Sequence, residues 1–337
     1  MIDEKKKMFC FLLSSFVILL IVFFLALMTG RYSVSLKSFW SVIIGGEQID
    51  PVDKSVILTL RLPRTIVALL VGIALSLSGL VYQEIFQNKL VSPDFLGVST
   101  GAGFGATIAI IIGFTGIKIS LIAFAFGIIT MLITIFVANI FGSRSQTILL
   151  LSGIIVGGFM NAGISFVKFM ADTDKQLGEI VYWLLGTFSK ATMEDVKILF
   201  PLVAIGAFIL YLIRWRINIV ALGKSEATTL GLNYTLYRGL IIGVSTFLTA
   251  AAVAYSGIVG WIGLIIPHLV RLLVGRDAKN TIPLTIVFGG IFTIICDIIS
   301  RSFTASEIPL SAVTGFLGTP IFVVILYVRR KTIYDKA

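Results

Sequence analysis

Histidine, cysteine and charged residues are scarce in this chain. Its 337 residues include one histidine, His268, and two cysteines, Cys10 and Cys296, and only 13% are Asp, Glu, Lys or Arg. A tetrahedral zinc site or an iron–sulfur cluster needs four nitrogen or sulfur ligands. The sequence therefore excludes such a centre, predicts no cofactor on this chain, and implies that any metal it handles arrives already complexed.

The low charge is matched by high hydropathy. Hydrophobic residues make up 57% of the chain and the mean hydropathy is +1.04, whereas soluble domains are about half apolar and about a quarter charged. One helical crossing of a membrane takes about 20 apolar residues, so a chain of this length has room for roughly ten. The composition excludes a soluble enzyme and predicts an all-α polytopic membrane protein.

Ten apolar runs, each bounded by charge, glycine or proline, are predicted to be membrane helices. They cover residues 9–28, 61–83, 95–113, 117–140, 147–170, 192–213, 236–256, 260–274, 281–300 and 309–328. The run at 260–274 is too short to span unaided. The runs do not alternate apolar and polar residues as β-barrel strands do. We interpret residues 1–337 as one membrane domain with an outer loop at 30–60 and an inner segment at 214–235.

The basic residues predict an orientation. Ten crossings place both termini on one side, and Lys5, Lys6 and Lys7 mark that side as cytoplasmic by the positive-inside rule. Predicted inner segments hold most of the Lys and Arg, while acidic residues nearly balance the basic ones outside. The net charge of +10 follows from this topology. Nucleic acid is not predicted as a partner, because the basic residues form no patch interleaved with aromatics.

A phosphate-binding loop is also missing. Gly223-Lys224-Ser225 resembles the end of such a loop, but the required first glycine would fall at position 218, which is Asn. The chain cannot hydrolyse ATP by that route. Its energy must come from an ion gradient or from a separate ATPase subunit.

Small residues recur at helical spacing. Gly97, Gly101 and Gly105 are four residues apart, and Gly153 and Gly157 repeat the spacing. Small residues at this spacing let membrane helices approach closely. Residues 101–106 formally fit a dinucleotide-binding pattern, but no strand precedes them, so we predict a helix-packing role.

Charged side chains near the predicted outer face are the main candidates for function. Arg61, Arg64 and Arg301 either reach lipid phosphates or bind carboxylates of an extracytoplasmic partner through the guanidinium fork. Asp297 lies inside a predicted span, where a carboxylate is a functional candidate. Arg301 follows one turn later, which favours a structural ion pair over a proton relay. We interpret His268 as a structural polar contact.

The inner segment is not an ordinary connector. Two glycine-containing motifs bracket a stretch with helical potential that presents small and apolar side chains. Exposed apolar surface of this kind marks a docking site, here for a partner on the inner side. The predicted contact residues are Ala221, Leu222, Gly223, Ala227, Leu230 and Gly231.

Several dispersed motifs agree with one known family. They are the R-L-P-R of residues 61–64, a W-x-x-G within 182–186, the G-L-x-x-P-H-x-x-R region of 260–271, and a D-x-x-x-R…E-I-P…G-x-P series from 297 to 320. Lys89, Trp261 and Ser311 depart from the family pattern. From about residue 58 to 328 the chain resembles the permease subunits of iron-siderophore and vitamin B12 type ABC importers.

This resemblance implies a type II ABC importer permease fold of about ten helices in a bacterial cytoplasmic membrane. It implies a two-fold dimer with a second identical or closely related permease, and an extracytoplasmic substrate-binding protein that docks on Arg61, Arg64 and Arg301. Two ATP-binding subunits, which carry ATP and magnesium, would dock inside on coupling helices at 217–232.

The cargo stays open at this point. An iron(III)-siderophore chelate is the leading hypothesis, and cobalamin, haem or molybdate carried by the same machine are alternatives. A carrier driven by an ion gradient through Asp297 is the less favoured reading, because buried charges are few.

Overall fold

The computed structural model describes residues 2–45, 50–141, 145–304 and 306–334. Their regular secondary structure is entirely helical, and these residues include no strand. Eight helices are long and apolar enough to cross a membrane, and Val98–Ile111 and Ile262–Val274 are shorter apolar helices. Together they match the ten predicted runs and confirm an all-helical membrane fold. The two ends of the predicted domain, residue 1 and residues 335–337, lie outside the described residues. Residues 46–49 of the predicted outer loop do as well.

The membrane-type helices follow the predicted runs closely. They are α1 (Ile2–Met28), α4 (Leu62–Ile85), α5 (Val98–Ile111), α6 (Ile117–Ile140), α7 (Gln146–Met170), α9 (Met193–Leu212), α12 (Tyr234–Ser256), α13 (Ile262–Val274), α14 (Ala278–Ser302) and α15 (Leu310–Tyr334). The short elements are α2 (Leu36–Ile44), α3 (Pro51–Ser55), the π-helix η1 (Val56–Arg61), the 3-10 helix η2 (Pro93–Leu96), α8 (Gln176–Leu185), α10 (Arg214–Val220) and α11 (Lys224–Thr229).

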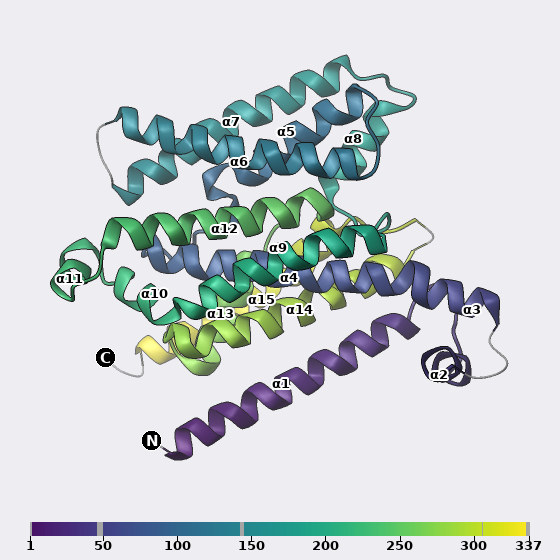
Figure 1. Ribbon diagram of the computed structural model, residues 1–337, viewed down its shortest axis with the longest axis horizontal. Coiled ribbons are helices and arrows are strands. Elements are labelled where there is room, and N and C mark those ends of the chain that lie inside the picture. Colours follow the sequence, from purple (N-terminus) through teal and green to yellow (C-terminus); the bar gives the residue numbers. More distant parts are fainter. Residues whose placement is uncertain (1, 46–49, 142–144, 305, 335–337) are drawn as a thin grey trace.

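The long helices run side by side and give the bundle two ends (Figure 1). One end carries α10 and α11, together with the first residues of α1 and the last described residues of α15; we call it the α11 end. The other carries α2, α3 and α8, and we call it the α3 end. Both described chain ends thus lie at the α11 end, as an even number of crossings requires.

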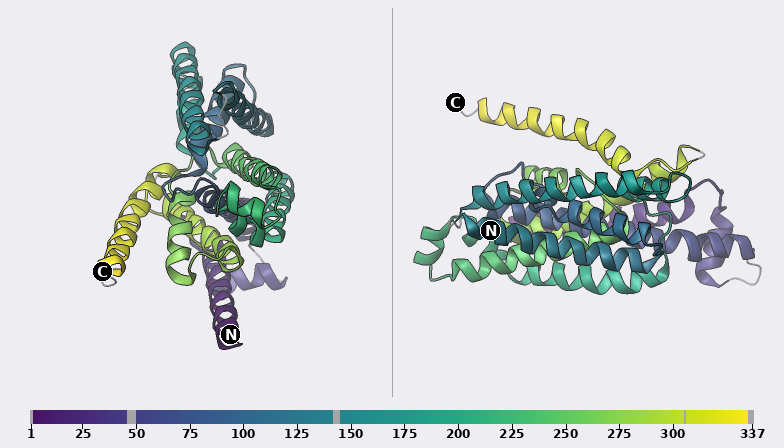
Figure 2. Two further views of the ribbon diagram at one scale, coloured as in Figure 1. Left: turned by 90° about the vertical axis from the view of Figure 1, so that its left-hand side faces the viewer. Right: turned by 90° about the horizontal axis from the view of Figure 1, so that it is seen from above.

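Helix α4 is the centre of the bundle. In its most apolar 18-residue stretch 83% of the residues are buried, whereas the corresponding figure is 22% for both α1 and α15. Figure 2 shows α1 and α15 extending away from the other helices. Two helices with this much exposed apolar surface need lipid or a partner protein to cover them.

Close helix contacts around α4 depend on missing side chains. A Cβ on Gly72 would clash with the carbonyl oxygen of Gly289 on α14, and a Cβ on Gly79 would clash with the carbonyl oxygen of Gly263 on α13. Backbone therefore meets backbone at both crossings, the geometry that small residues permit between membrane helices.

The predicted outer loop contains more helix than expected. Asp50 caps α3 by accepting from Val52 N at 2.8 Å, and α3, η1 and α4 then run without a break. Ser35 caps α2, and Gly45, at a φ of +82°, ends it. Hydropathy did not reveal these elements because polar caps, rather than apolar length, define them.

Candidate functional site

A buried ion-pair cluster lies at the α3 end, where α4, α14 and the segment before α15 meet. Arg64 Nε donates to Asp297 Oδ1 at 2.7 Å, and Arg64 Nη1 donates to Glu307 Oε1 at 2.6 Å. Arg301 Nε lies 3.3 Å from Asp297 Oδ2, one turn along α14. Asp297 is fully buried between the two arginines. The two positive and two negative charges therefore neutralise one another inside the protein.

The last turn of α1 is held by two arginines. Arg61 Nη1 donates to the carbonyl oxygens of Leu27 at 3.0 Å and Met28 at 2.8 Å, and Arg301 Nη2 donates to that of Ala26. The last carbonyls of a helix have no intrahelical partner, and a cation there is also favoured by the helix dipole. The two side chains tie the end of α1 to η1 and α14.

These contacts change how the predicted docking residues are understood. The structure places Arg61, Arg64 and Arg301 together at the α3 end, but they are only 5%, 7% and 6% exposed and are bonded to acceptors of this chain. Their snorkelling to lipid phosphates would also require these bonds to break. A docking role stays a prediction that requires exchange of internal bonds. Sequence reasoning missed the acceptors because Glu307 and the end of α1 are distant in sequence.

Asp297 is equally constrained. Its two carboxylate oxygens face Arg64 and Arg301, so protonation would break a buried ion pair and leave positive charge uncompensated. This geometry suits a structural pair, and it does not suit the proton relay that an ion-driven carrier would need.

A tyrosine–aspartate pair joins two further elements of the α3 end. The hydrogen bond from Tyr32, which is 43% exposed, to the Asp53 carboxylate raises the pKa of Tyr32. Asp53 is buried on α3. Tyr32 therefore stays neutral and fixes the segment after α1 against α3.

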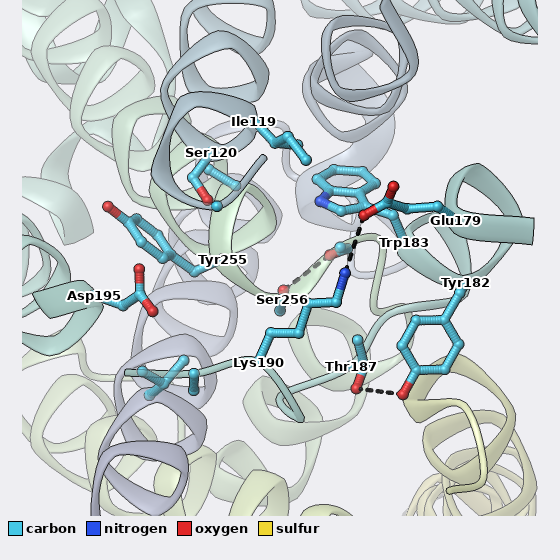
Figure 3. A pocket seen from close by; sticks show the side chains of 15 residues that line it. Ile119, Ser120, Glu179, Tyr182, Trp183, Thr187, Lys190, Asp195, Tyr255 and Ser256 are labelled. Atoms are coloured by element: carbon cyan, nitrogen blue, oxygen red, sulfur yellow. Dashed lines mark hydrogen bonds and ion pairs between the residues drawn. The ribbon is translucent and has the colours of Figure 1, made fainter. Parts of the chain in front are cut away.

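A small cavity of about 110 Å³ also opens at the α3 end, between α6, α8, α9 and α12 (Figure 3). Trp183, Tyr255 and Asp195 line it, and Lys190 Nζ lies 3.0 Å from Glu179 Oε1 across it. The Lys190 and Glu179 side chains are 74% and 36% exposed. Exposed ion pairs contribute little, so this pair can open readily.

The predicted coupling segment forms two short helices at the α11 end. α10 ends at Val220, and Gly223, at a φ of +110°, turns the chain into α11. Leu222 and Leu230 are 55% and 61% exposed, whereas Ala227 is fully buried. Gly231 then adopts a φ of +77°. The segment presents two leucines outward on a buried anchor, as a docking surface requires.

Internal hydrogen bonds hold this segment to the bundle. Gln87 Nε2, at the end of α4, donates to the carbonyl oxygen of Ala221 at 2.7 Å. Asn218 Nδ2 donates to Asp277 Oδ1 at 2.8 Å and its Oδ1 accepts from Ala278 N at 2.9 Å. These bonds connect α10 and the turn that follows it to the end of α4 and the start of α14.

A second polar cluster lies toward the α11 end and was not predicted as a unit. Arg271 Nη1 on α13 donates to Glu84 Oε1 at 2.7 Å, and Arg271 Nη2 donates to Gln83 Oε1. Nearby, His268 Nε2 lies 2.7 Å from the carbonyl oxygen of Lys89. His268 and Arg271 stood in the family motif of residues 260–271, but no local signal identified Glu84 as the partner of Arg271.

The predicted packing glycines lie at tight contacts among η2, α5, α6 and α7. A Cβ on Gly101 would clash with Thr130, on Gly105 with Phe126, and on Gly153 with the carbonyl oxygen of Phe95. Gly157 lies against Thr100 and Gly97. Gly97 itself precedes α5 at a φ of +75°, so it forms a turn and not part of a helical stripe.

Within the described residues, no group of three or more His, Cys, Asp or Glu side chains could hold a metal ion. The geometry thus offers buried ion pairs at one end, an exposed two-leucine segment at the other and a close-packed helical core between them.

Comparisons with known proteins agree. A model of the FecCD transport family matches residues 18–328. The chain is 38% identical over 315 residues, 92% of this chain and 93% of the relative, to the molybdate import system permease protein MolB of Haemophilus influenzae. It is 35% identical over 308 residues, 89% and 93% of the two chains, to a probable iron chelatin transport system permease protein of Helicobacter pylori strain 26695.

A solved structure confirms the permease fold. The chain matches an inward-facing structure described as that of a putative metal-chelate type ABC transporter, with a TM-score of 0.85 and 37% identity, over 94% of this chain and 98% of that one. The relatives are permease subunits of import systems, so the chain is a multi-pass membrane subunit without an ATPase site of its own. Family model, relatives and fold lead to one conclusion: this chain belongs to the FecCD transport family.

Proposed function

We propose that this chain, acting as one membrane domain, moves an iron(III)-siderophore chelate into the cytoplasm using ATP hydrolysed by a partner subunit. The observation that carries the proposal is its similarity, across 94% of its length, to a metal-chelate type ABC transporter. The iron chelatin relative supports the same class of cargo. The family implies an ATPase, a substrate-binding protein and a second permease as partners.

Molybdate is the second candidate, because the relative with 38% identity is a molybdate import permease. Both cargoes bring their own coordination shell, so neither requires metal ligands from this chain. The described contacts favour neither of them.

Uptake in cells that carry or lack the gene separates the candidates. The panel is radio-iron as several ferric siderophores, radiolabelled molybdate, haem and cobalamin. Loss of one ferric chelate alone supports the proposal. Loss of molybdate, haem or cobalamin uptake alone would identify a different cargo and leave the assignment as an ABC importer permease unchanged. Loss of none would contradict the proposed import of a chelate.

We further propose that the α11 end faces the cytoplasm and that α10 and α11 receive the ATPase motion. Leu222 and Leu230 are exposed there, and the turn at Gly223 has a φ of +110° that other residues adopt only with strain. Gly223→Val should leave assembly with the ATPase detectable but reduce substrate-stimulated ATP hydrolysis several-fold. Gly243→Val, at a helical position with open space, is the matched control. Equal stimulation in both variants would contradict the coupling role.

The α3 end is then the docking face for the substrate-binding protein. Arg61 and Arg64 are tested together by charge reversal, with capture of the loaded binding protein and thermal stability measured in parallel. Weaker capture at unchanged stability supports direct docking. If the variant is less stable, and capture falls only as much as the fraction of folded protein falls, the arginines act in the internal cluster instead.

A further inference from the structure

A cavity of about 570 Å³ opens at the α11 end, between the end of α6, the start of α7 and the start of α12. Its volume falls within the range of small-molecule sites. The turn before α11 completes its rim through Gly223 and Lys224, and Gln87 joins from the end of α4. The cavity therefore touches the segment to which we assigned ATPase coupling.

The lining of this cavity changes character with depth. Asn139 on α6 and Gln146 on α7 lie at the helix ends, near the rim, whereas Ile135 lies about one turn further in and Met131 and Ile242 about two turns. At 1.5 Å per residue, this is a depth of roughly 11 Å. A ligand that fills the cavity has an apolar part inside and a polar part at the rim.

The rim is positively charged. Lys224 and Arg238 line the cavity, and the described lining residues include no Asp or Glu. Glu226 lies beside Gly223 without lining the cavity, so the local balance stays positive. The first residues of α7 and of α12 also line it, and the positive ends of two long helix dipoles therefore meet at the rim.

Apolar side chains next to the lining residues are exposed. Phe136 and Ile140 on α6 and Leu236 and Leu240 on α12 each adjoin a lining residue in the chain and are 40–66% exposed. In a membrane such faces contact acyl chains. An occupant with an acyl chain can therefore enter sideways from the bilayer, with its headgroup at the level of the helix ends.

We propose that this cavity binds an anionic phospholipid, with the phosphate at Lys224 and Arg238 and an acyl chain along Met131 and Ile135. Basic recesses between membrane helices are the recognised chemistry for such headgroups. The bound lipid would brace α11 against α6, α7 and α12. The lipid site itself does not depend on the identity of the cargo.

The test is native mass spectrometry of the purified full-length chain, titrated with dioleoyl phosphatidylglycerol or with zwitterionic dioleoyl phosphatidylcholine. Wild-type protein should bind phosphatidylglycerol at least tenfold more tightly. The double variant Lys224→Gln/Arg238→Gln should lose this preference. Its matched control, Arg276→Gln/Lys279→Gln, removes two exposed cations from the same end outside the cavity and should retain it.

A second pair of variants tests the cavity without changing charge. Gly239 lines the cavity, and a Cβ there meets open space, so Gly239→Leu projects a side chain into it. Gly243, one turn further along α12, has equally open surroundings but does not line the cavity. Gly239→Leu should weaken phosphatidylglycerol binding at least fivefold, and Gly243→Leu should bind as wild type.

Three outcomes would overturn the proposal. They are equal binding of the two lipids by wild-type protein, wild-type binding by Gly239→Leu, and displacement of phosphatidylglycerol by millimolar inorganic phosphate alone, which would identify a free-anion site. Because every readout is lipid binding, failure here leaves the uptake result untouched, and failure of the uptake test leaves this result untouched.

Discussion

The two ends of α4 are anchored by ion pairs of different construction. At the α3 end, Arg64 of α4 and Arg301 enclose Asp297, which is fully buried. Toward the α11 end, Arg271 of α13 reaches Glu84 of α4, whose side chain is 23% exposed. At the α3 end one carboxylate, Asp297, lies between two arginines. Toward the α11 end one arginine, Arg271, has a carboxylate and a side-chain amide as acceptors.

This difference between the two ion-pair clusters indicates which end of the bundle can move more easily. Removing one partner of a fully buried cluster leaves a charge that water cannot reach, which is strongly destabilising. Arg271 is also buried, with a side chain only 1% exposed, but the Glu84 carboxylate is 23% exposed, so water can take its place, and Arg271 retains Gln83 as a second acceptor. We infer that the α3 end is the rigid anchor and that the α11 end, which carries α10 and α11, is the more adaptable one.

The largest effect is expected at Asp297. Asp297→Ala leaves Arg64 and Arg301 facing each other without their shared carboxylate and should destabilise the protein by about 3–5 kcal/mol. Thermal unfolding of the purified chain in detergent measures this. Glu307→Gln, at a side chain that is 25% exposed, should cost less than half as much. A melting temperature of Asp297→Ala within one or two degrees of wild type would remove the distinction between the two ends.

Glu84→Ala tests the other end. It removes one charged hydrogen bond from Arg271 and leaves the bond to Gln83, so the expected cost is about 1.5–3 kcal/mol. Glu84→Gln should recover part of it. The same unfolding assay applies, and a loss larger than that of Asp297→Ala would reverse the order of the two anchors.

The middle of α4 combines close packing with hydrogen bonds from Ser76 and Ser78 to the backbone of α14 and α12. Gly79→Ala forces a methyl group onto the backbone of Gly263, whereas Gly243→Ala on α12 meets open space. The first should cost about 1–3 kcal/mol through overpacking and the second much less. Equal unfolding temperatures for the two variants would show that the α4–α13 contact yields more easily than its geometry suggests.

Much of this architecture could be predicted from the sequence because membrane helices are defined by local composition. The apolar runs located all ten helices, and the spacing of Gly101, Gly105 and Gly153 located a real close contact. Helices α2 and α3 were missed, since their caps carry little hydropathy signal. Gly97 was placed in a helix because the spacing rule does not report a positive φ.

The partners of the charged residues could not be predicted in this way. Asp297 and Arg301 lie one turn apart, so their pairing was readable, but Arg64 meets Glu307 across 243 positions. Arg61 is bonded to main-chain carbonyls, which no side-chain motif encodes. An arginine near a membrane surface has the same local signature whether it points outward to a partner or inward to a helix end. Tertiary structure is needed to distinguish the two.

The smallest effect is expected at the exposed ion pair over the cavity of the α3 end. Lys190→Gln removes a pair with Glu179 whose side chains are 74% and 36% exposed, and such pairs are worth about 0–1 kcal/mol. The unfolding temperature should therefore stay close to that of wild type, and added salt should abolish the remaining difference. Asp297→Ala supplies the contrast in the same assay, because salt cannot screen a charge pair that is closed to solvent. If Lys190→Gln were as damaging as Asp297→Ala, burial would not be the property that separates strong anchors from weak ones in this protein.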